Sequence, residues 1–292
     1  MKLLVELNDL KLLETPCADA FLVGAKDVSL RPSKIFTDFE IIKERAKALN
    51  KKVFLNAMAQ VKENELEVFL KKLEKLIPYF DGVFYTDLAV YQALNEMDYQ
   101  GIKVYFPTTY ITSSKERDFF LKYNDIVLAS PEVNTEELEN IVNEHTAVLV
   151  FGAYALFYSA RKLLTRYYEY RNLPISSDFS DKSEAHFKIK EEFREELYPV
   201  TEDEEGFHIF SNGHYVMLKE KILDNAAYGV ILTPFLNYEK TLVVLETIHA
   251  AAEKELTESE AFDKLQNLNL PIGLTTGMAN KKTILTKESN NG

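Results

Sequence analysis

The sequence has 292 residues, of which 46% are hydrophobic and 27% are charged, and its formal net charge is −12 at pH 7. A chain of this size can bury a large core as one globular domain, and no apolar run approaches the ~20 residues that a membrane span requires. The acidic balance argues against a protein that binds nucleic acid strongly by itself, because phosphate contacts dominate such binding.

The single cysteine, Cys17, limits the metal and redox chemistry of the chain. One thiol cannot form an intrachain disulfide, a cysteine-rich zinc site or a four-thiolate iron–sulfur cluster. Residues 1–16 are briefly apolar but contain Glu6 and Asp9, which is unlike a signal peptide. We therefore expect a cytoplasmic protein.

Short apolar segments alternate with amphipathic ones along the chain. The predicted strands are residues 1–7, 19–24, 52–56, 82–85, 102–106, 125–128, 147–151 and 228–232. The predicted helices cover residues 63–76, 113–122 and 135–144, and a further helix carries Leu242, Leu245, Ile248 and His249. Thr37 with Glu40 is a predicted capping box, and Thr135 is a predicted N-cap.

This alternation is typical of parallel β/α architecture. Eight strands favour a closed (β/α)8 TIM-like barrel, and an open doubly wound parallel sheet is the alternative. We expect one barrel domain over residues 1–285 and a disordered tail at residues 286–292.

The pattern breaks between the seventh and eighth strands. Residues 174–211 are predicted to be a polar insertion that contains a hairpin of residues 187–190 with residues 207–211. Ordinary connections are shorter, so this insertion is expected to be a lid, a docking surface or a flexible excursion. The acidic run at residues 202–205 is more typical of a solvated turn than of a site.

The seventh strand opens through Gly152 into an aromatic and basic segment. Its members include Tyr154, Phe157, Tyr158, Arg161 and Arg166. Ligands of β/α proteins bind at the carboxyl ends of strands, which favours a site here. A core strand followed by a packed helix explains the same pattern.

This segment resembles the signature of the collagenase-like peptidase family of unassigned catalytic type, family thirty-two. That signature contains two cysteines, whose positions here are taken by Ala155 and Lys162. Gly152, Ala153 and Leu163 fit the frame, whereas Ala160 and Thr165 replace a glycine and a serine. Because the thiols are replaced, the resemblance implies no iron–sulfur cofactor in this chain.

Further segments carry the resemblance. Arg31 takes the position of a family arginine, Asp87 that of a family aspartate, and residues 276–278 fit a family segment. Residues 231–234 read Ile-Leu-Thr-Pro where the family has Ile-Glu-Gly-Arg. An acid and an arginine are therefore replaced as well.

In a barrel, the strand ends would form the rim of one site. The expected rim residues are Asn8, Gly24, Asn56, Asp87, Thr108, Ser130, Gly152 and Thr233. The candidates for ligand or partner binding are Arg31, Asn56, Asp87, Tyr158, Arg161, His208 and Asn212. Strand-end Asn and Asp residues alternatively cap the following helices, and histidines beside a turn, as at His208 and His214, are usually surface residues. No catalytic residues and no metal site are predicted.

We weigh three functional hypotheses, of which the family resemblance implies the first two. The leading hypothesis is a cluster-free subunit or accessory protein in prephenate-dependent tRNA uridine 5-hydroxylation. A longer, cysteine-bearing paralogue is the expected hetero-oligomeric partner, and tRNA would bind through the complex, away from any membrane. The alternatives are a hydrolase of the collagenase-like peptidase type and a non-catalytic metabolite-binding barrel.

Overall fold

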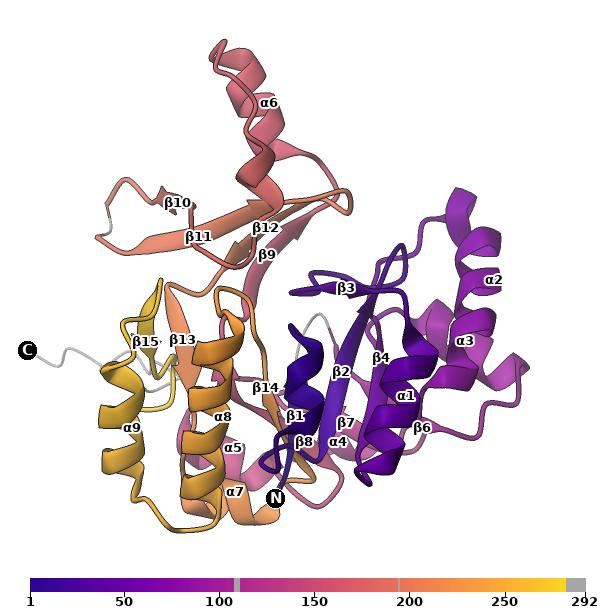
Figure 1. Ribbon diagram of the computed structural model, residues 1–292, viewed down its shortest axis with the longest axis vertical. Coiled ribbons are helices and arrows are strands. Elements are labelled where there is room, and N and C mark those ends of the chain that lie inside the picture. Colours follow the sequence, from indigo (N-terminus) through magenta and orange to yellow (C-terminus); the bar gives the residue numbers. More distant parts are fainter. Residues whose placement is uncertain (108–110, 194, 282–292) are drawn as a thin grey trace, which may run out of the picture.

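The computed structural model describes residues 1–107, 111–193 and 195–281 and contains a closed barrel of eight parallel strands (Figure 1). Around the barrel the strands are β1 (Lys2–Glu6), β2 (Ala20–Ala25), β4 (Lys52–Ala57), β5 (Gly82–Tyr85), β6 (Ile102–Tyr105), β7 (Ile126–Leu128), β8 (Thr146–Gly152) and β14 (Tyr228–Ile231). β14 pairs with both β8 and β1 and so closes the ring. The predicted (β/α)8 barrel is confirmed, and the open sheet is wrong. The predicted tail and Thr108 lie outside the described residues.

In most barrel strands, successive residues belong to different parts of the core. Leu4, Leu22, Phe54, Phe84 and Val104 share one buried cluster. Their immediate neighbours along the strands, including Leu3, Phe21 and Val53, belong to a second and larger cluster with residues of the covering helices. Side chains alternate across a strand, so the first cluster fills the barrel and the second joins its wall to the helices. Burial on both faces explains why the strands are continuous apolar runs.

The helices cover the outside of the barrel (Figure 1). They are α1 (Phe39–Ala48), α2 (Leu66–Leu76), α3 (Leu88–Glu96), α4 (Ser114–Phe120), α5 (Thr135–Ile141), α7 (Glu220–Asn225), α8 (Tyr238–Ala252) and α9 (Glu258–Gln266). Short 3-10 helices are η1 (Leu10–Glu14), η2 (Glu63–Glu65), η3 (Ile77–Tyr79) and η4 (Ser177–Ser180).

Two predicted helix caps are wrong by one residue. The N-cap of α1 is Asp38, not Thr37, and its side chain makes no capping bond. The N-cap of α5 is Asn134, because this position places Glu137 at N3 and completes a reciprocal capping box. Thr135 is instead the first helical residue, and its hydroxyl donates to the carbonyl of Ala279 at 3.0 Å.

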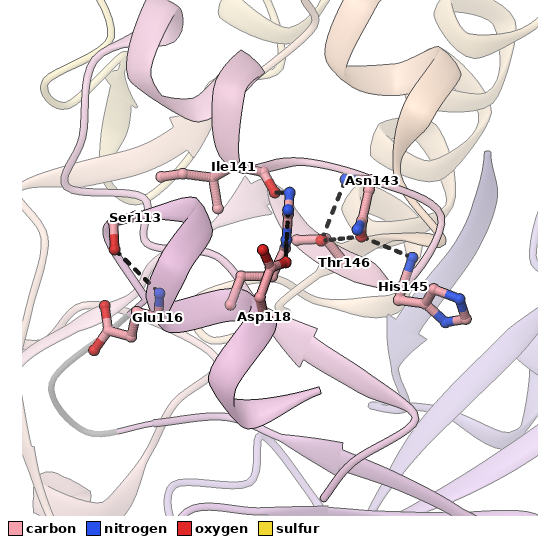
Figure 2. Close-up of polar contacts among 8 residues, drawn as sticks. Ser113, Glu116, Asp118, Ile141, Asn143, His145 and Thr146 are labelled. Carbon is pink, nitrogen blue, oxygen red and sulfur yellow. Dashed lines mark hydrogen bonds and ion pairs between the residues drawn. The ribbon is translucent and has the colours of Figure 1, made fainter. Parts of the chain in front are cut away.

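Polar contacts hold the turn before β8, at the amino-terminal end of the barrel, and the start of α4, which follows β6 at the other end (Figure 2). Thr146 Oγ1 donates to Asn143 Oδ1 at 2.8 Å, and the same amide oxygen accepts from the backbone N–H of His145 at 3.0 Å. Ser113 Oγ accepts from the N–H of Glu116 at 3.2 Å and caps α4. These side chains satisfy backbone groups of a turn and a helix end, which makes them structural.

The segment between β8 and β14 forms a second sheet that projects from the carboxyl-terminal end of the barrel together with α6 (Leu163–Tyr170) (Figure 1). Its four antiparallel strands follow the order β10 (Phe187–Lys190), β11 (Leu197–Glu202), β12 (Phe207–Phe210) and β9 (Ala155–Ser159). The predicted hairpin is wrong, because β11 lies between β10 and β12 and pairs with both. We call β9 to β12 with α6 and η4 the insertion.

Three further short strands pair at the carboxyl-terminal end of the barrel sheet. β13 (Gly213–Val216) runs antiparallel to the end of β8, and β15 (Gly273–Thr275) pairs with β13. β3 (Ile35–Phe36) pairs with the end of β2. The carboxyl-terminal end of the barrel is therefore the crowded end, and the insertion covers part of it.

Candidate functional site

A cavity of about 420 Å³ opens at the carboxyl-terminal end of the barrel, and we call it the mouth cavity. Its walls come from the segments that follow β2, β4, β5, β6 and β7, with β9 of the insertion on the remaining side. The lining residues are Leu30, Arg31, Met58, Gln60, Thr86, Phe106, Pro107, Glu132, Ala155, Leu156, Phe157, Tyr158 and Ala160. A smaller cavity of about 40 Å³ is lined by some of the same residues and by Glu6, Asn56 and Phe210. This is the end at which barrels of this type bind ligands.

Three of the predicted site residues come together beside the mouth cavity. Arg31 and Tyr158 line it, and the Tyr158 ring stacks on the imidazole of His208 with the ring centroids 5.2 Å apart. The Tyr158 hydroxyl donates to the carbonyl of Glu205 at 2.9 Å. Burial raises the pKa of Tyr158 and lowers the pKa of His208, and the positive charge of Arg31 also lowers the pKa of His208. His208 is therefore neutral at pH 7.

Behind Tyr158, a buried ion pair joins two segments of the insertion, the one after η4 and the one between β11 and β12. The Lys182 ammonium donates to Asp203 Oδ2 at 2.7 Å, and His208 Nε2 lies 3.6 Å from Asp203 Oδ1. Burial by itself raises the pKa of Asp203, but His208 and Lys182 more than offset it and hold that pKa far below its usual range. The backbone carbonyl of Lys182 also accepts from the N–H of Phe235 at 2.6 Å, which joins η4 to the barrel. Nothing in the polar sequence around Lys182 indicates that its side chain is buried.

Asn56 and Asp87 hold backbone segments of the rim. Asn56 Nδ2 donates to the carbonyl of Leu30 at 3.3 Å, and Asn56 Oδ1 accepts from the N–H of Met58 at 3.3 Å. The Asp87 carboxylate accepts from the N–H groups of Ala89 at 2.9 Å and Val61 at 3.1 Å, and it caps α3. Asp87 therefore matches the capping alternative, whereas Asn56 binds backbone groups away from a helix start and also lines the smaller cavity.

The structure places the remaining candidates away from the mouth cavity. Arg161 and Asn212 are exposed, Arg161 between β9 and α6 and Asn212 between β12 and β13. His208 and His214 are both buried, so the expectation of surface histidines is wrong for this pair. His214 stacks on Phe151 with centroids 5.1 Å apart, and burial lowers its pKa to about 3.

The sequence analysis missed Glu6, which is buried at the end of β1. Its carboxylate accepts from the N–H of Ser33 at 2.7 Å, the hydroxyl of Ser33 at 2.9 Å and the N–H of Thr233 at 2.9 Å. Glu6 thus joins the ends of β1 and β14 to the segment after β2. A signal was available, because an acid at the end of a buried strand requires such partners.

Ala155 and Lys162, which the resemblance sets at the positions of two cysteines, lie in different surroundings. Ala155 lines the mouth cavity, whereas Lys162 lines a second cavity of about 650 Å³ between residues 26–35 and the insertion. The buried Glu202 carboxylate accepts from the N–H groups of Leu164 at 2.7 Å and Thr165 at 3.1 Å. Glu202 therefore accepts hydrogen bonds from backbone N–H groups that have no partner within the first turn of α6.

The described residues contain neither a metal-binding cluster nor a helix that could cross a membrane. No group of three or more His, Cys, Asp and Glu side chains there is arranged to hold a metal ion. Among the helices of the same ranges, none has the length and apolarity that crossing a bilayer requires.

Comparisons with known proteins identify the family. Among solved structures, the chain is similar to the Bacillus cereus spore cortex-lytic enzyme SleL, at a TM-score of 0.40 and 8% identity over 86% of this chain and 74% of that one. It is also similar to the C-terminal domain of a candidate chitinase from Desulfitobacterium hafniense DCB-2, at a TM-score of 0.43 and 7% identity over 86% of this chain and 99% of that one. A search of curated protein sequences finds no match. The model of peptidase family U32 matches residues 6–230, and the chain therefore belongs to peptidase family U32.

Proposed function

We propose that this protein is a cluster-free subunit or accessory protein in prephenate-dependent tRNA uridine 5-hydroxylation, and that a longer, cysteine-bearing paralogue is its partner. The observation that carries the proposal is the family frame around β8, in which Ala155 and Lys162 replace the two cysteines. Iron–sulfur clusters are held by thiolates, and this chain has only Cys17. In this proposal the partner supplies the cluster.

Exposed apolar side chains on the insertion support a protein partner. Ten of the seventeen large apolar side chains that are exposed in the described part of the chain lie between residues 156 and 197. Tyr170 is 83% exposed and Phe193 is 90% exposed. Such a concentration of exposed apolar side chains is typical of a protein-binding surface. β9 and β10 are also the edges of the insertion sheet, where a further strand can pair.

The same region carries positive charge next to exposed aromatic rings. Arg161, Lys162, Arg166 and Arg171 flank or belong to α6, together with Tyr167 and Tyr170. Arg166 pairs with Glu169 at 2.9 Å, which reduces the local charge. In a chain with a net charge of −12, this small patch suits tRNA binding through a complex better than binding alone.

The geometry does not favour peptide hydrolysis, which the family name implies. Burial raises the pKa of the Cys17 thiol, which makes it a poorer nucleophile. Cys17 also precedes β2 and lies at the amino-terminal end of the barrel, opposite the mouth cavity. His208, the histidine beside that cavity, contacts an aromatic ring and a carboxylate, not a hydroxyl or a thiol.

Co-purification tests the proposed partnership. Tagged protein isolated from its host should carry the cysteine-bearing paralogue, and the double variant Tyr167→Ser/Tyr170→Ser should carry much less of it. The matched control is Val68→Ser/Leu88→Ser, because these side chains are each 58% exposed but belong to barrel helices. Recovery of the wild-type chain without the paralogue would contradict the proposal.

A further inference from the structure

The mouth cavity has the position and size of a small-molecule site. It lies at the end of the barrel where ligands bind, and its volume of about 420 Å³ is in the range of small-ligand pockets, roughly 300–1,000 Å³. Met58, Phe106 and Phe157 give it apolar and aromatic walls, and Gln60 and Thr86 add uncharged polar groups. This mixed lining suits an organic ligand that combines polar or charged ends with an apolar segment.

The two formal charges of the cavity come from opposite sides of the barrel. Arg31 follows β2 and Glu132 follows β7, and these strands are separated by β4, β5 and β6 in a ring of eight. The Glu132 carboxylate raises the pKa of Tyr154, and Arg31 lowers that of His208, although burial is the main cause of both shifts. Glu132 and Arg31 therefore affect the pKa values of buried groups on opposite sides of the covered end of the barrel.

Both charged residues have a backbone that the rim holds in place. The carbonyl of Leu30 accepts from Asn56 Nδ2 at 3.3 Å, and Arg31 itself has a φ of 56°, a conformation that costs a non-glycine residue free energy. On the other side, the N–H of Glu132 donates to Ser130 Oγ at 3.0 Å. Charges of opposite sign on opposite walls of the cavity favour a ligand that carries both signs over one with a single charge.

We propose that the mouth cavity binds a small zwitterion with an anionic group at one end, a cationic group at the other and an apolar or aromatic segment between them. Arg31 binds the anionic end, because its guanidinium matches a carboxylate, and Glu132 binds the cationic end. Phe106, Phe157 and Tyr158 contact the segment in the middle. This chemistry is shared by short peptides with free ends and by aromatic ω-amino acids. The inference does not depend on the proposed role in tRNA hydroxylation.

Isothermal titration of the purified full chain tests the proposal with a set of matched probes. Leucyl-phenylalanine and 4-(aminomethyl)benzoate carry both charges and represent the two sources of this chemistry. N-acetyl-leucyl-phenylalanine lacks the cation, and leucyl-phenylalanine amide lacks the anion. We expect at least one of the two zwitterions to bind at millimolar concentration or below. For the dipeptide, loss of either charge should weaken binding by about tenfold or more. If only 4-(aminomethyl)benzoate binds, its methyl ester and its N-acetyl derivative take the place of the capped dipeptides.

Each variant should remove only one of these preferences. Arg31→Met should bind the zwitterion and its amide or ester equally, and Glu132→Gln should bind the zwitterion and its N-acetyl form equally. The matched controls Arg45→Met and Glu136→Gln change residues that do not line the cavity and should keep both preferences. Glu132 is exposed, so its variant carries the test even if Arg31→Met does not fold. Failure of both zwitterions to bind, or equal binding of charged and capped forms to the wild type, would overturn the proposal.

Discussion

Two histidines of this protein are kept neutral by burial. His208 and His214 each have no exposed surface, and burial is the main cause of the lowered pKa of both. The ring nitrogens of His214 have no hydrogen-bond partner in the described residues. A protonated imidazole there would lose its hydration without gaining a partner, so the folded state excludes the proton.

The substitution His214→Leu should therefore reduce the acid sensitivity of the fold. The pKa of His214 is lowered to about 3, whereas an unfolded histidine has a pKa of about 6.5, so between these pH values only the unfolded state binds the proton. The wild type loses stability as the pH falls below ~6.5, by at most about 1.4 kcal/mol per pH unit from this residue. Urea unfolding at pH 7.5 and 5.5 should show a smaller loss for the variant. Equal losses would mean that His214 is protonated in the folded state.

Residue types at strand ends could be predicted from the sequence, but their contacts could not. Asn56 and Asp87 lie at the carboxyl ends of β4 and β5 as expected, yet both bind backbone groups. The partners of Glu6 include Thr233, which is 227 positions away in the chain. Such contacts depend on how the barrel closes, which local patterns do not specify.

At the scale of elements, the insertion departs most from the sequence prediction. The barrel strands are continuous buried runs, whereas β9 is half exposed. The residues of β9 are equally compatible with a helix. β11 contains Pro199, which weakens its strand pattern, and it pairs with β12 and β10 only after the chain turns twice. Pairing with neighbours overrides the local preference in both strands.

The ion pair of Lys182 and Asp203 should stabilise the insertion, because it joins the segment after η4 to the turn between β11 and β12. Their side chains are 7% and 17% exposed, so Lys182→Met leaves a buried carboxylate without its main partner. We expect a loss of about 3–5 kcal/mol in the free energy of unfolding, measured by urea denaturation. Lys182→Met/Asp203→Asn should recover part of that loss because the charge is removed.

The exposed pair of Lys71 and Glu67 provides the control for this experiment. It lies on α2 with side chains that are 67% and 82% exposed, so Lys71→Met should have little effect. If Lys182→Met lowers the free energy of unfolding as little as Lys71→Met does, the buried pair does not stabilise the insertion.

We expect that only glycine fits at position 152, where the end of β8 lies against the backbone that follows β14. Its φ is +131°, and a Cβ atom there would lie 2.5 Å from the carbonyl oxygen of Leu232. Gly152→Ala should therefore shift the backbone and destabilise the fold by about 2 kcal/mol or more, measured by thermal or urea unfolding. Gly273→Ala is the matched control, because no atom lies within 4 Å of its Cβ position and it should be tolerated. Equal tolerance of both substitutions would contradict this interpretation of the strand end.

At the scale of the whole molecule, the barrel was predictable and the mouth cavity was not. All eight predicted strands lie within one residue of the observed bounds at each end. Strands that are buried on both faces consist of continuous apolar residues, and such runs can be recognised in the sequence. The cavity combines side chains from five barrel connections with β9, and Glu132 was not among the predicted site residues. Arg31 and Glu132 are far apart in the sequence, and they face the same cavity only because the strand order places β2 across the barrel from β7.

Mass spectrometry of tRNA nucleosides from a strain that lacks this protein tests the proposed function most directly. We expect the deletion strain to contain less 5-hydroxyuridine and less of its derivatives. The wild-type chain and Val68→Ser/Leu88→Ser should restore them, whereas Tyr167→Ser/Tyr170→Ser should not. Unchanged tRNA nucleosides in the deletion strain, with the cysteine-bearing paralogue still present, would contradict the proposed function.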